Sequence, residues 1–305
     1  MARYATLDVG SNSVLIYIAE KDDAGNFKTL EDRAAITKLG EDLKETGVLK
    51  PEAMDRTIEA LREFKALMDK YNIDDYAAIG TMALREAKNA KEFLERVEKE
   101  VGLKIEVIPG EEEAKLSHLA VVLGLGIKDE DVVIFDIGGG STEFIFSKGP
   151  QIQNKFSLNI GALVLTNKFL KFDPVKREEH DELFKYLKEE FAKVEFPEKI
   201  DKAIGMGGNV TSITAVKFKM EKYDPNKVQG AVVTKEEVKN QIELYLSKTV
   251  EERKSIVGLQ PKRAETILAG ATILYAILDR LGMDSFVVSD RGIRHGLMFA
   301  RFSQK

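Results

Sequence analysis

The sequence predicts an α/β protein built from two copies of one fold, and three observations carry this prediction. Two short stretches, Asp8–Ser13 and Asp136–Glu143, repeat each other, and each follows an apolar run typical of a buried strand. Each stretch continues into a second β-rich run, so each should form a tight turn between two strands. The spacing repeats as well, because 72 residues separate Asp8 from Gly80 and 69 separate Asp136 from Gly205. The alternative is that two Gly-rich turns recur by chance in an α/β protein, and the agreement of spacing and element order disfavours it.

The elements of the first half follow from apolar patterning and from the positions of glycine and proline. Pro51 opens a helix, because proline fits the first helical position and the apolar residues after it recur at helical spacing. Pro109-Gly110 breaks the chain before a second amphipathic stretch. The expected strands are 4–7, 14–19, 27–36, 76–79 and 105–108, and the expected helices start at 51 and span 90–101 and 111–123.

The second half repeats this order with more helices. Its strands are expected at 132–135, 144–146, a run ending at Gly205, and 286–288; its helices at 161–170, 175–193, 235–247, 249–257, 263–281 and a last one to about Phe302. A Gly-rich, charged stretch at 124–131 precedes the second repeat. The predicted domains are therefore 1–122 and 123–295, with a C-terminal helix of about 296–305 packing back on the first.

Composition limits the class of protein. The chain has 305 residues, of which 44% are hydrophobic and 32% charged, as in globular proteins. No apolar run suits a membrane span or a cleavable signal, and no cysteine is available for a disulfide or a thiolate site. The net charge of −5 argues against bulk attraction to nucleic acid. We expect a cytoplasmic protein with no membrane or nucleic-acid partner, and leave a homodimer open.

The three histidines, 118, 180 and 295, are not at ligand spacing. Any metal should therefore be Mg²⁺ or Mn²⁺ bound by oxygen ligands. We expect His118 and His180 to lie on helix surfaces.

The twin turns point to phosphate chemistry. Backbone N–H groups and hydroxyls in Gly/Ser turns bind phosphate oxygens, and a neighbouring carboxylate suits a hard metal ion. If the repeats face each other, Asp8 and Asp136 enter one cleft. Alternatively, each Asp caps its own turn. The glycines at 138–140 and 205–208 lack the spacing of dinucleotide folds and the Gly-Lys-Ser/Thr ending of a P-loop, which disfavours both classes.

Three further features carry competing interpretations. Glu111-Glu112-Glu113 stands at a helix start, where acidic side chains are favourable by themselves, and catalytic use of one of them is the alternative. Arg85 follows a strand; it forms either a surface ion pair or a clamp on phosphate oxygens. Lys217, Lys219 and Lys222 form a basic run that reads as a solvated face.

Six stretches together resemble the exopolyphosphatase / guanosine pentaphosphate phosphohydrolase family of the actin-like ATPase superfamily. They occur in family order and cover nearly the whole chain. They are Asp8–Ser13, Thr81–Arg85, Pro109–Ala114, Asp136–Glu143, Gly205–Thr211 and Ser289–Arg294.

The resemblance implies two actin-like (ribonuclease H-like) α/β domains with the active site in the cleft between them. It implies that Glu113 is the general base and that Arg85 contacts the phosphate under attack. Asp136 takes the Mg²⁺ position, with Asp8 and Glu143 in support. The implied phosphate-binding residues are Gly10, Ser11, Asn12, Ser13, Gly138, Gly139, Gly140, Ser141, Thr142, Gly207, Gly208, Asn209 and Thr211.

The expected activity is Mg²⁺-dependent release of terminal orthophosphate from inorganic polyphosphate. Hydrolysis of guanosine pentaphosphate by the same residues, a non-catalytic sensor of a phosphate ligand, and an actin-like kinase are the alternatives. The chain departs from the family pattern at Asn209, often threonine, and at His295, often glutamate. The extra helical domains of longer members are also absent from this sequence, which leaves processivity open.

Overall fold

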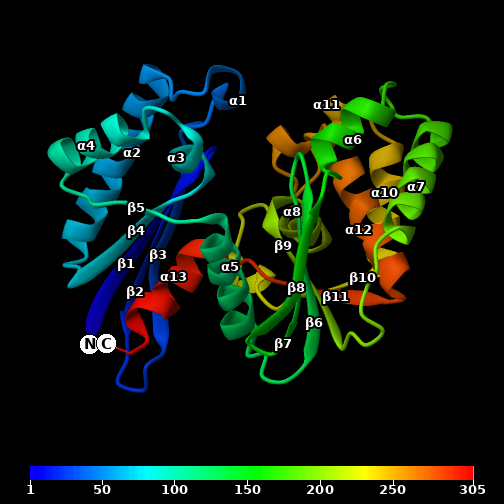
Figure 1. The fold of residues 1–305 in the computed structure, drawn as a ribbon. Coiled ribbons are helices and arrows are strands. Elements are labelled where there is room, and N and C mark those ends of the chain that lie inside the picture. The colour runs from blue at the N-terminus through cyan, green and yellow to red at the C-terminus, as the bar shows by residue number, and fades with distance from the viewer. Residues whose placement is uncertain (305) are drawn as a thin grey trace. The chain divides into compact units, whose positions relative to one another are not determined.

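The computed structural model describes residues 1–304 and contains two sheets, drawn in Figure 1. The five-stranded sheet has the order β3-β2-β1-β4-β5, and the six-stranded sheet the order β10-β11-β9-β6-β7-β8. The strands are β1 (Ala2–Val9), β2 (Ser13–Lys21), β3 (Phe27–Ile36), β4 (Asp75–Gly80), β5 (Glu106–Val107), β6 (Asp131–Ile137), β7 (Thr142–Lys148), β8 (Gln151–Leu158), β9 (Lys202–Met206), β10 (Val232–Thr234) and β11 (Ser285–Val288).

The helices grouped with the five-stranded sheet precede β6 in the chain, except for the C-terminal helix. They are α1 (Leu43–Thr46), α2 (Pro51–Lys70), α3 (Met82–Glu86), α4 (Ala90–Val101), α5 (Gly110–Leu125) and the C-terminal α13 (Ile293–Phe302). The others are α6 (Ala162–Phe169), α7 (Arg177–Ala192), α8 (Gly207–Lys217), α9 (Pro225–Val228), α10 (Lys235–Leu246), α11 (Val250–Arg253), the 3₁₀ turn η1 (Pro261–Arg263) and α12 (Ile267–Leu281).

The sheet topology confirms the internal duplication. In the first sheet β1 pairs antiparallel with β2 and parallel with β4. In the second, β6 pairs antiparallel with β7 and parallel with β9. The order β3-β2-β1-β4-β5 is thus matched by β8-β7-β6-β9-β11, and β10 is an addition at the edge. Equivalent residues of the two repeats therefore occupy equivalent places in their own sheets.

Contacts divide the chain into two compact units. Unit 1 holds Met1–Ala120 and the C-terminal segment that begins at Arg291, and unit 2 holds Val121–Asp290. The division falls within α5. We propose that the two units correspond to the two expected domains, 1–122 and 123–295.

Alternation along each central strand explains both cores. In unit 1, Ala5, Leu7 and Val9 of β1 pack under α2 and α4, whereas Tyr4 faces α13 on the other side (Figure 1). In unit 2, Val133 and Phe135 of β6 join the large core of α6, α7, α8, α10 and α12. Each central strand is therefore buried on both faces, which holds its carboxyl end rigidly.

Helix α13 is held in unit 1 by polar contacts as well as by packing. The Arg294 guanidinium donates two hydrogen bonds, of 2.8 and 3.0 Å, to the Asp32 carboxylate. His295 Nε2 lies 3.1 Å from the same carboxylate, and its Nδ1 accepts from the Gly292 N–H. Burial lowers the pKa of His295 to about 4, so the ring is neutral at pH 7. His295 is thus a structural residue.

Several predicted details were wrong. His118 and His180 are buried, not on helix surfaces, because each helix turns that face toward the core. The helix expected at 249–257 ends at Arg253, whose buried side chain donates to the Tyr245 carbonyl. The helix expected from Arg263 starts at Ile267. No helix in the described part of the chain is both long and apolar enough to cross a membrane.

Candidate functional site

The turns that follow Asp8 and Asp136, called the Asp-Gly turns below, contain the same hydrogen bond. In unit 1 the Gly10 N–H donates to the Ser13 carbonyl at 3.0 Å, and in unit 2 the Gly138 N–H donates to the Ser141 carbonyl at 2.9 Å. Each turn joins the central strand of its sheet to the antiparallel neighbour. The repeat seen in the sequence is therefore a repeat of backbone conformation at the carboxyl end of β1 and of β6.

Arg85 and Glu113 form an ion pair in unit 1. The Arg85 guanidinium donates to Glu113 Oε2 at 2.8 Å and to the Ile108 carbonyl at 3.0 Å. Glu113 lies in the first turn of α5, where its own N–H donates to the Pro109 carbonyl. Both side chains keep more than a quarter of their surface exposed, 27% for Arg85 and 29% for Glu113. A fixed yet accessible carboxylate is suited to accept a proton from water.

Asp8 is buried close to this pair. Its Oδ1 has no hydrogen-bond partner among the described residues. Burial, followed by repulsion from the Glu113 carboxylate, raises the pKa of Asp8 to about 7, and the Arg294 guanidinium opposes this rise. Unit 1 therefore brings three predicted site residues together: Asp8, Arg85 and Glu113. Perturbed carboxyl groups with a specific charged neighbour are frequent at functional sites.

Asp136 occupies the equivalent place in unit 2. It pairs across the sheet with Glu143, whose Oε1 accepts hydrogen bonds from the hydroxyls of Ser141 and Ser157. Burial, followed by repulsion from Glu143, raises the pKa of Asp136 to about 6. Two neighbouring carboxylates that repel each other favour a cation beside them. In both units the aspartate of the repeat thus lies near a glutamate; Asp8 is buried and Asp136 is half-buried.

The glycines after β9 allow the backbone to approach Asp136. Gly207 has φ +81°, and a Cβ there would lie 1.9 Å from Asp136 Oδ1, so a side chain is excluded. Gly207 and Gly208 begin α8, which the sequence analysis did not predict as a helix. No side chain caps this helix start. Its first N–H groups are therefore donors suited to a phosphate oxygen beside the Asp136 carboxylate.

Arg263 is a site residue that the sequence analysis missed. Its guanidinium covers Gly208, because a Cβ on Gly208 would lie 1.8 Å from an Arg263 nitrogen. Burial lowers the pKa of Arg263, whereas the Asp136 carboxylate raises it. The Nε atom has no partner within the described residues. A half-buried guanidinium over a phosphate-type loop is a strong anion-binding feature. Arg263 belongs to η1, which is separate from α12, and this separation is seen only in the structure.

Some predicted phosphate-binding side chains hold the loops in place. The Thr142 hydroxyl is buried and donates to the Ile160 carbonyl. Asn209 is buried and donates to the Ile137 carbonyl at 2.6 Å. The hydroxyl of Thr211 lies 3.4 Å from the Gly208 carbonyl, and the hydroxyl of Ser11 faces the Met82 sulfur at 3.8 Å. These contacts anchor the turns, so their backbone N–H groups are the better candidates for phosphate contacts.

The residues present fit Mg²⁺ or Mn²⁺. Among residues 1–304, no three Asp, Glu, His or Cys side chains gather as a complete metal site. Mg²⁺ does not require one, because it usually takes one or two carboxylates and fills its shell with water and phosphate oxygens. Asp136 with Glu143, and the unpartnered Oδ1 of Asp8, supply carboxylate oxygens of this kind.

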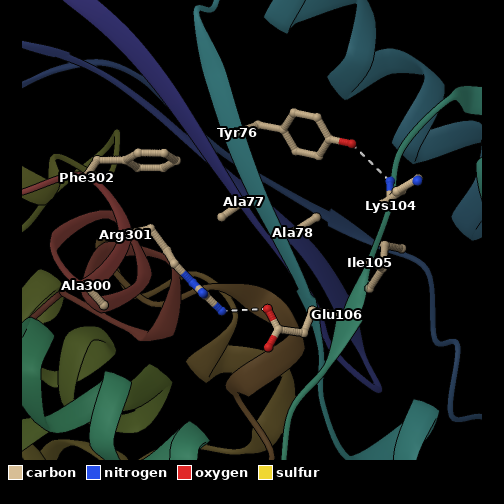
Figure 2. A pocket seen from close by; sticks show the side chains of 9 residues that line it. All are labelled: Tyr76, Ala77, Ala78, Lys104, Ile105, Glu106, Ala300, Arg301 and Phe302. Atoms are coloured by element: carbon tan, nitrogen blue, oxygen red, sulfur yellow. Dashed lines mark hydrogen bonds and ion pairs between the residues drawn. The ribbon is translucent and has the colours of Figure 1, made fainter. Parts of the chain in front are cut away.

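A separate pocket in unit 1 contains none of the predicted site residues. Figure 2 shows this pocket of about 800 Å³ at β4, β5 and the end of α13. The Arg301 guanidinium is paired with the Glu106 carboxylate, and the Tyr76 hydroxyl accepts from the Lys104 N–H. The polar groups that line it thus bond to one another, and we assign it no function.

Comparison with known proteins identifies the family. Residues 17–304 match the model described as the Ppx/GppA phosphatase family. The chain is 34% identical to a bifunctional 3-dehydroquinate synthase/phosphatase of Fusobacterium nucleatum, matched over 94% of this chain and 44% of that protein. It is 27% identical to Exopolyphosphatase 2 of Mycobacterium tuberculosis, over 97% of this chain and 98% of that protein. A guanosine-5'-triphosphate,3'-diphosphate pyrophosphatase of Photobacterium profundum is 28% identical, over 99% of this chain and 59% of that protein.

Solved structures agree with the sequence match. A crystal structure of the Aquifex aeolicus Ppx/GppA phosphatase superposes with a TM-score of 0.89 at 39% identity, covering 99% of this chain and all of that one. The expected actin-like α/β fold is confirmed by this likeness, together with the duplicated sheets. The chain spans less than half of the Fusobacterium relative and nearly all of the Mycobacterium one. This chain, with its twin Asp-Gly turns and its Arg85–Glu113 pair, belongs to the Ppx/GppA phosphatase family.

Proposed function

We propose that this chain is an exopolyphosphatase, which releases terminal orthophosphate from inorganic polyphosphate with the help of Mg²⁺. The observation that carries the proposal is the 2.8 Å pair of the Glu113 carboxylate and the Arg85 guanidinium beside buried Asp8. A carboxylate suited to accept a proton is thus paired with a guanidinium suited to bind phosphate, which supports the proposal. The name of the full-length Mycobacterium relative supports polyphosphate as the substrate.

In the proposed reaction, Glu113 accepts a proton from a water molecule as that water attacks the terminal phosphorus. Arg85 holds the carboxylate in place and offers its remaining donors to the phosphoryl oxygens. In unit 2, the N–H groups at the start of α8 and the Arg263 guanidinium bind phosphate oxygens and stabilise negative charge. Positioning and electrostatics dominate, as in phosphoryl transfer generally.

Asp136 is the proposed main ligand of the metal, with Glu143 and Asp8 in support. The metal, when bound, neutralises charge on the phosphate oxygens. The ion would be held through carboxylate oxygens, and the hydroxyls of Ser141 and Ser157 orient the Glu143 carboxylate by donating to its Oε1.

Guanosine pentaphosphate is the second candidate substrate, favoured by the name of the Photobacterium relative. The same groups would cleave its terminal phosphate. A sensor that binds phosphate without cleaving it, and a kinase, fit the pair of Arg85 and Glu113 less well, because neither needs a general base for water. We further propose a cytoplasmic protein whose partner is this small anionic substrate, with a homodimer as one state of association.

The deciding experiment measures phosphate release from long-chain polyphosphate and from guanosine pentaphosphate, each with Mg²⁺. We expect the larger kcat/KM on polyphosphate. A larger value on the nucleotide would assign the second function. Tight binding of both compounds without phosphate release would identify a sensor, and ATP-dependent phosphorylation of an acceptor would identify a kinase.

A double-mutant cycle tests the placement of Arg263. Gly208→Ala should lower kcat/KM about 10²-fold, because the new methyl displaces the Arg263 guanidinium from the start of α8. Arg263→Ala should cost a similar factor. In the Arg263→Ala background the methyl meets no guanidinium, so Gly208→Ala should cost little more. Full additivity of the two losses would show that the residues act independently.

A further inference from the structure

A basic pocket lies at the C-terminal end of α8 in unit 2. It has a volume of about 490 Å³ and is lined by Phe218, Lys219, Met220, Glu221, Lys222 and Lys227. Three lysines therefore face one glutamate, in a chain whose net charge is −5. Two of these lysines belong to the run that the sequence analysis read as a solvated face. Both are exposed, as predicted, and the structure also gathers them around a hollow.

The ammonium groups of these lysines are not used by the protein. All three residues are exposed, and within residues 1–304 none of Lys219, Lys222 and Lys227 has an ion pair or a side-chain hydrogen bond. By contrast, neighbouring Lys217 donates to the Val232 carbonyl and lies over the Phe218 ring. Three ammonium groups gathered with one carboxylate leave a net positive charge, and an anionic ligand relieves their mutual repulsion.

A lysine at position 219 is unexpected, because its backbone is in a conformation that usually takes glycine. The Lys219 N–H donates to the Val216 carbonyl and the Met220 N–H to the Ala215 carbonyl, which is a Schellman end to α8. Lys219 itself has φ +49°, in the left-handed region where glycine is the usual residue. The negative end of the helix dipole favours a cation near Lys219. It does not account for Lys222 and Lys227, which lie beyond the helix.

The segment that lines the pocket returns toward the phosphate-binding groups of unit 2. Tyr223, next to Lys222, donates from its hydroxyl to the Asp290 carboxylate. Tyr223 also interacts electrostatically with Arg263, whose guanidinium covers Gly208. Helix α8 has 11 residues, so its two ends are about 16 Å apart. A polyanion that contacts both Gly208 and the pocket must therefore span at least about 16 Å, for which a tripolyphosphate is too short.

We propose that this pocket binds distal phosphates of inorganic polyphosphate, so that the chain favours long polymers over short ones. The proposal rests on the proposed function and names the preferred substrate length. Lys219, Lys222 and Lys227 bind the polymer without touching the phosphate that is cleaved. They should therefore affect binding of long chains and leave the chemical step unchanged.

The test compares the triple variant Lys219→Gln/Lys222→Gln/Lys227→Gln with a matched control. The control, Lys155→Gln/Lys185→Gln/Lys239→Gln, removes three exposed lysines elsewhere in unit 2 and changes the net charge equally. In the triple variant we expect KM for long-chain polyphosphate to rise about 10-fold or more, with kcat and the KM for tripolyphosphate unchanged. The slope of log KM against log salt should fall by about 2, at about 0.7 for each lost lysine contact. The control should match the parent protein.

Direct binding separates this proposal from the proposed function. Affinity for long-chain polyphosphate is measured in the Glu113→Gln background, where hydrolysis does not interfere. Weaker binding in the triple variant supports the pocket even if the parent protein releases no phosphate. Equal binding by the triple variant and the control overturns the pocket even if the parent protein is an active phosphatase. The proposal is also overturned if the three lysines are needed to bind a single-stranded RNA oligonucleotide but not to bind polyphosphate.

Discussion

Replacing Glu113 by glutamine should lower the rate of phosphate release from polyphosphate by about 10²–10⁴-fold. The amide has nearly the same shape as the carboxylate, and its oxygen can still accept from the Arg85 guanidinium. It cannot accept a proton from the attacking water. The fold should remain intact, because a partly exposed ion pair of this kind contributes only about 0–1 kcal/mol to the free energy of unfolding.

The control for this prediction is Glu112→Gln, one residue earlier on α5. It removes the same charge from the same helix turn but lies outside the pair with Arg85. Glu112→Gln should keep kcat within about twofold of the parent enzyme, and both variants should melt within a few degrees of it. Parent-level phosphate release by Glu113→Gln would remove Glu113 as the general base.

Replacing Asp136 by asparagine should abolish the response to Mg²⁺ and lower activity about 10³-fold. Asp136 is half-buried beside Glu143, and the neutral amide is a poor ligand for a hard cation. The loss should be visible without any assay of activity. For the parent protein, Mg²⁺ at about 100 times its Kd should raise the free energy of unfolding by about 2.7 kcal/mol. Asp136→Asn should show almost no such rise when its Tm is measured with and without Mg²⁺.

Asp131→Asn is the matched control, because Asp131 begins the same strand but pairs with Lys199. Its Mg²⁺-dependent rise in Tm should equal that of the parent protein. If Asp136→Asn kept the full rise, the metal would have to be bound elsewhere. Loss of the rise with retained activity would separate the metal site from the reaction.

The twin turns show how far local sequence can determine structure. An aspartate followed two residues later by glycine and then by serine, between two β-rich runs, permits few backbone conformations. Both turns form with the same Gly N–H to Ser carbonyl bond. The strand order then follows from the repeat, because two copies of one pattern fold in the same way. Glu113 and Arg85 were predicted from the family resemblance, since spacing alone left both with ordinary structural explanations.

Helix α8 shows where local sequence fails. Its residues Gly207–Lys217 are rich in glycine and β-branched side chains, which form isolated helices poorly. The helix forms because most of its residues are buried by the surrounding unit, so packing outweighs propensity. Its first N–H groups, next to Asp136, are therefore donors that a one-dimensional pattern does not display.

The sequence by itself determined the duplicated α/β fold, the positions of the two Asp-Gly turns and the family, because these depend on residues close together in the chain. Only the tertiary structure decided the place of Arg263 over Gly208 and the grouping of Lys219, Lys222 and Lys227 around a pocket. Arg263 lies 55 residues after Gly208, and no local pattern encodes which distant side chain packs over a glycine. Close packing of the whole unit selects that neighbour, and the electrostatics of the site follow from it.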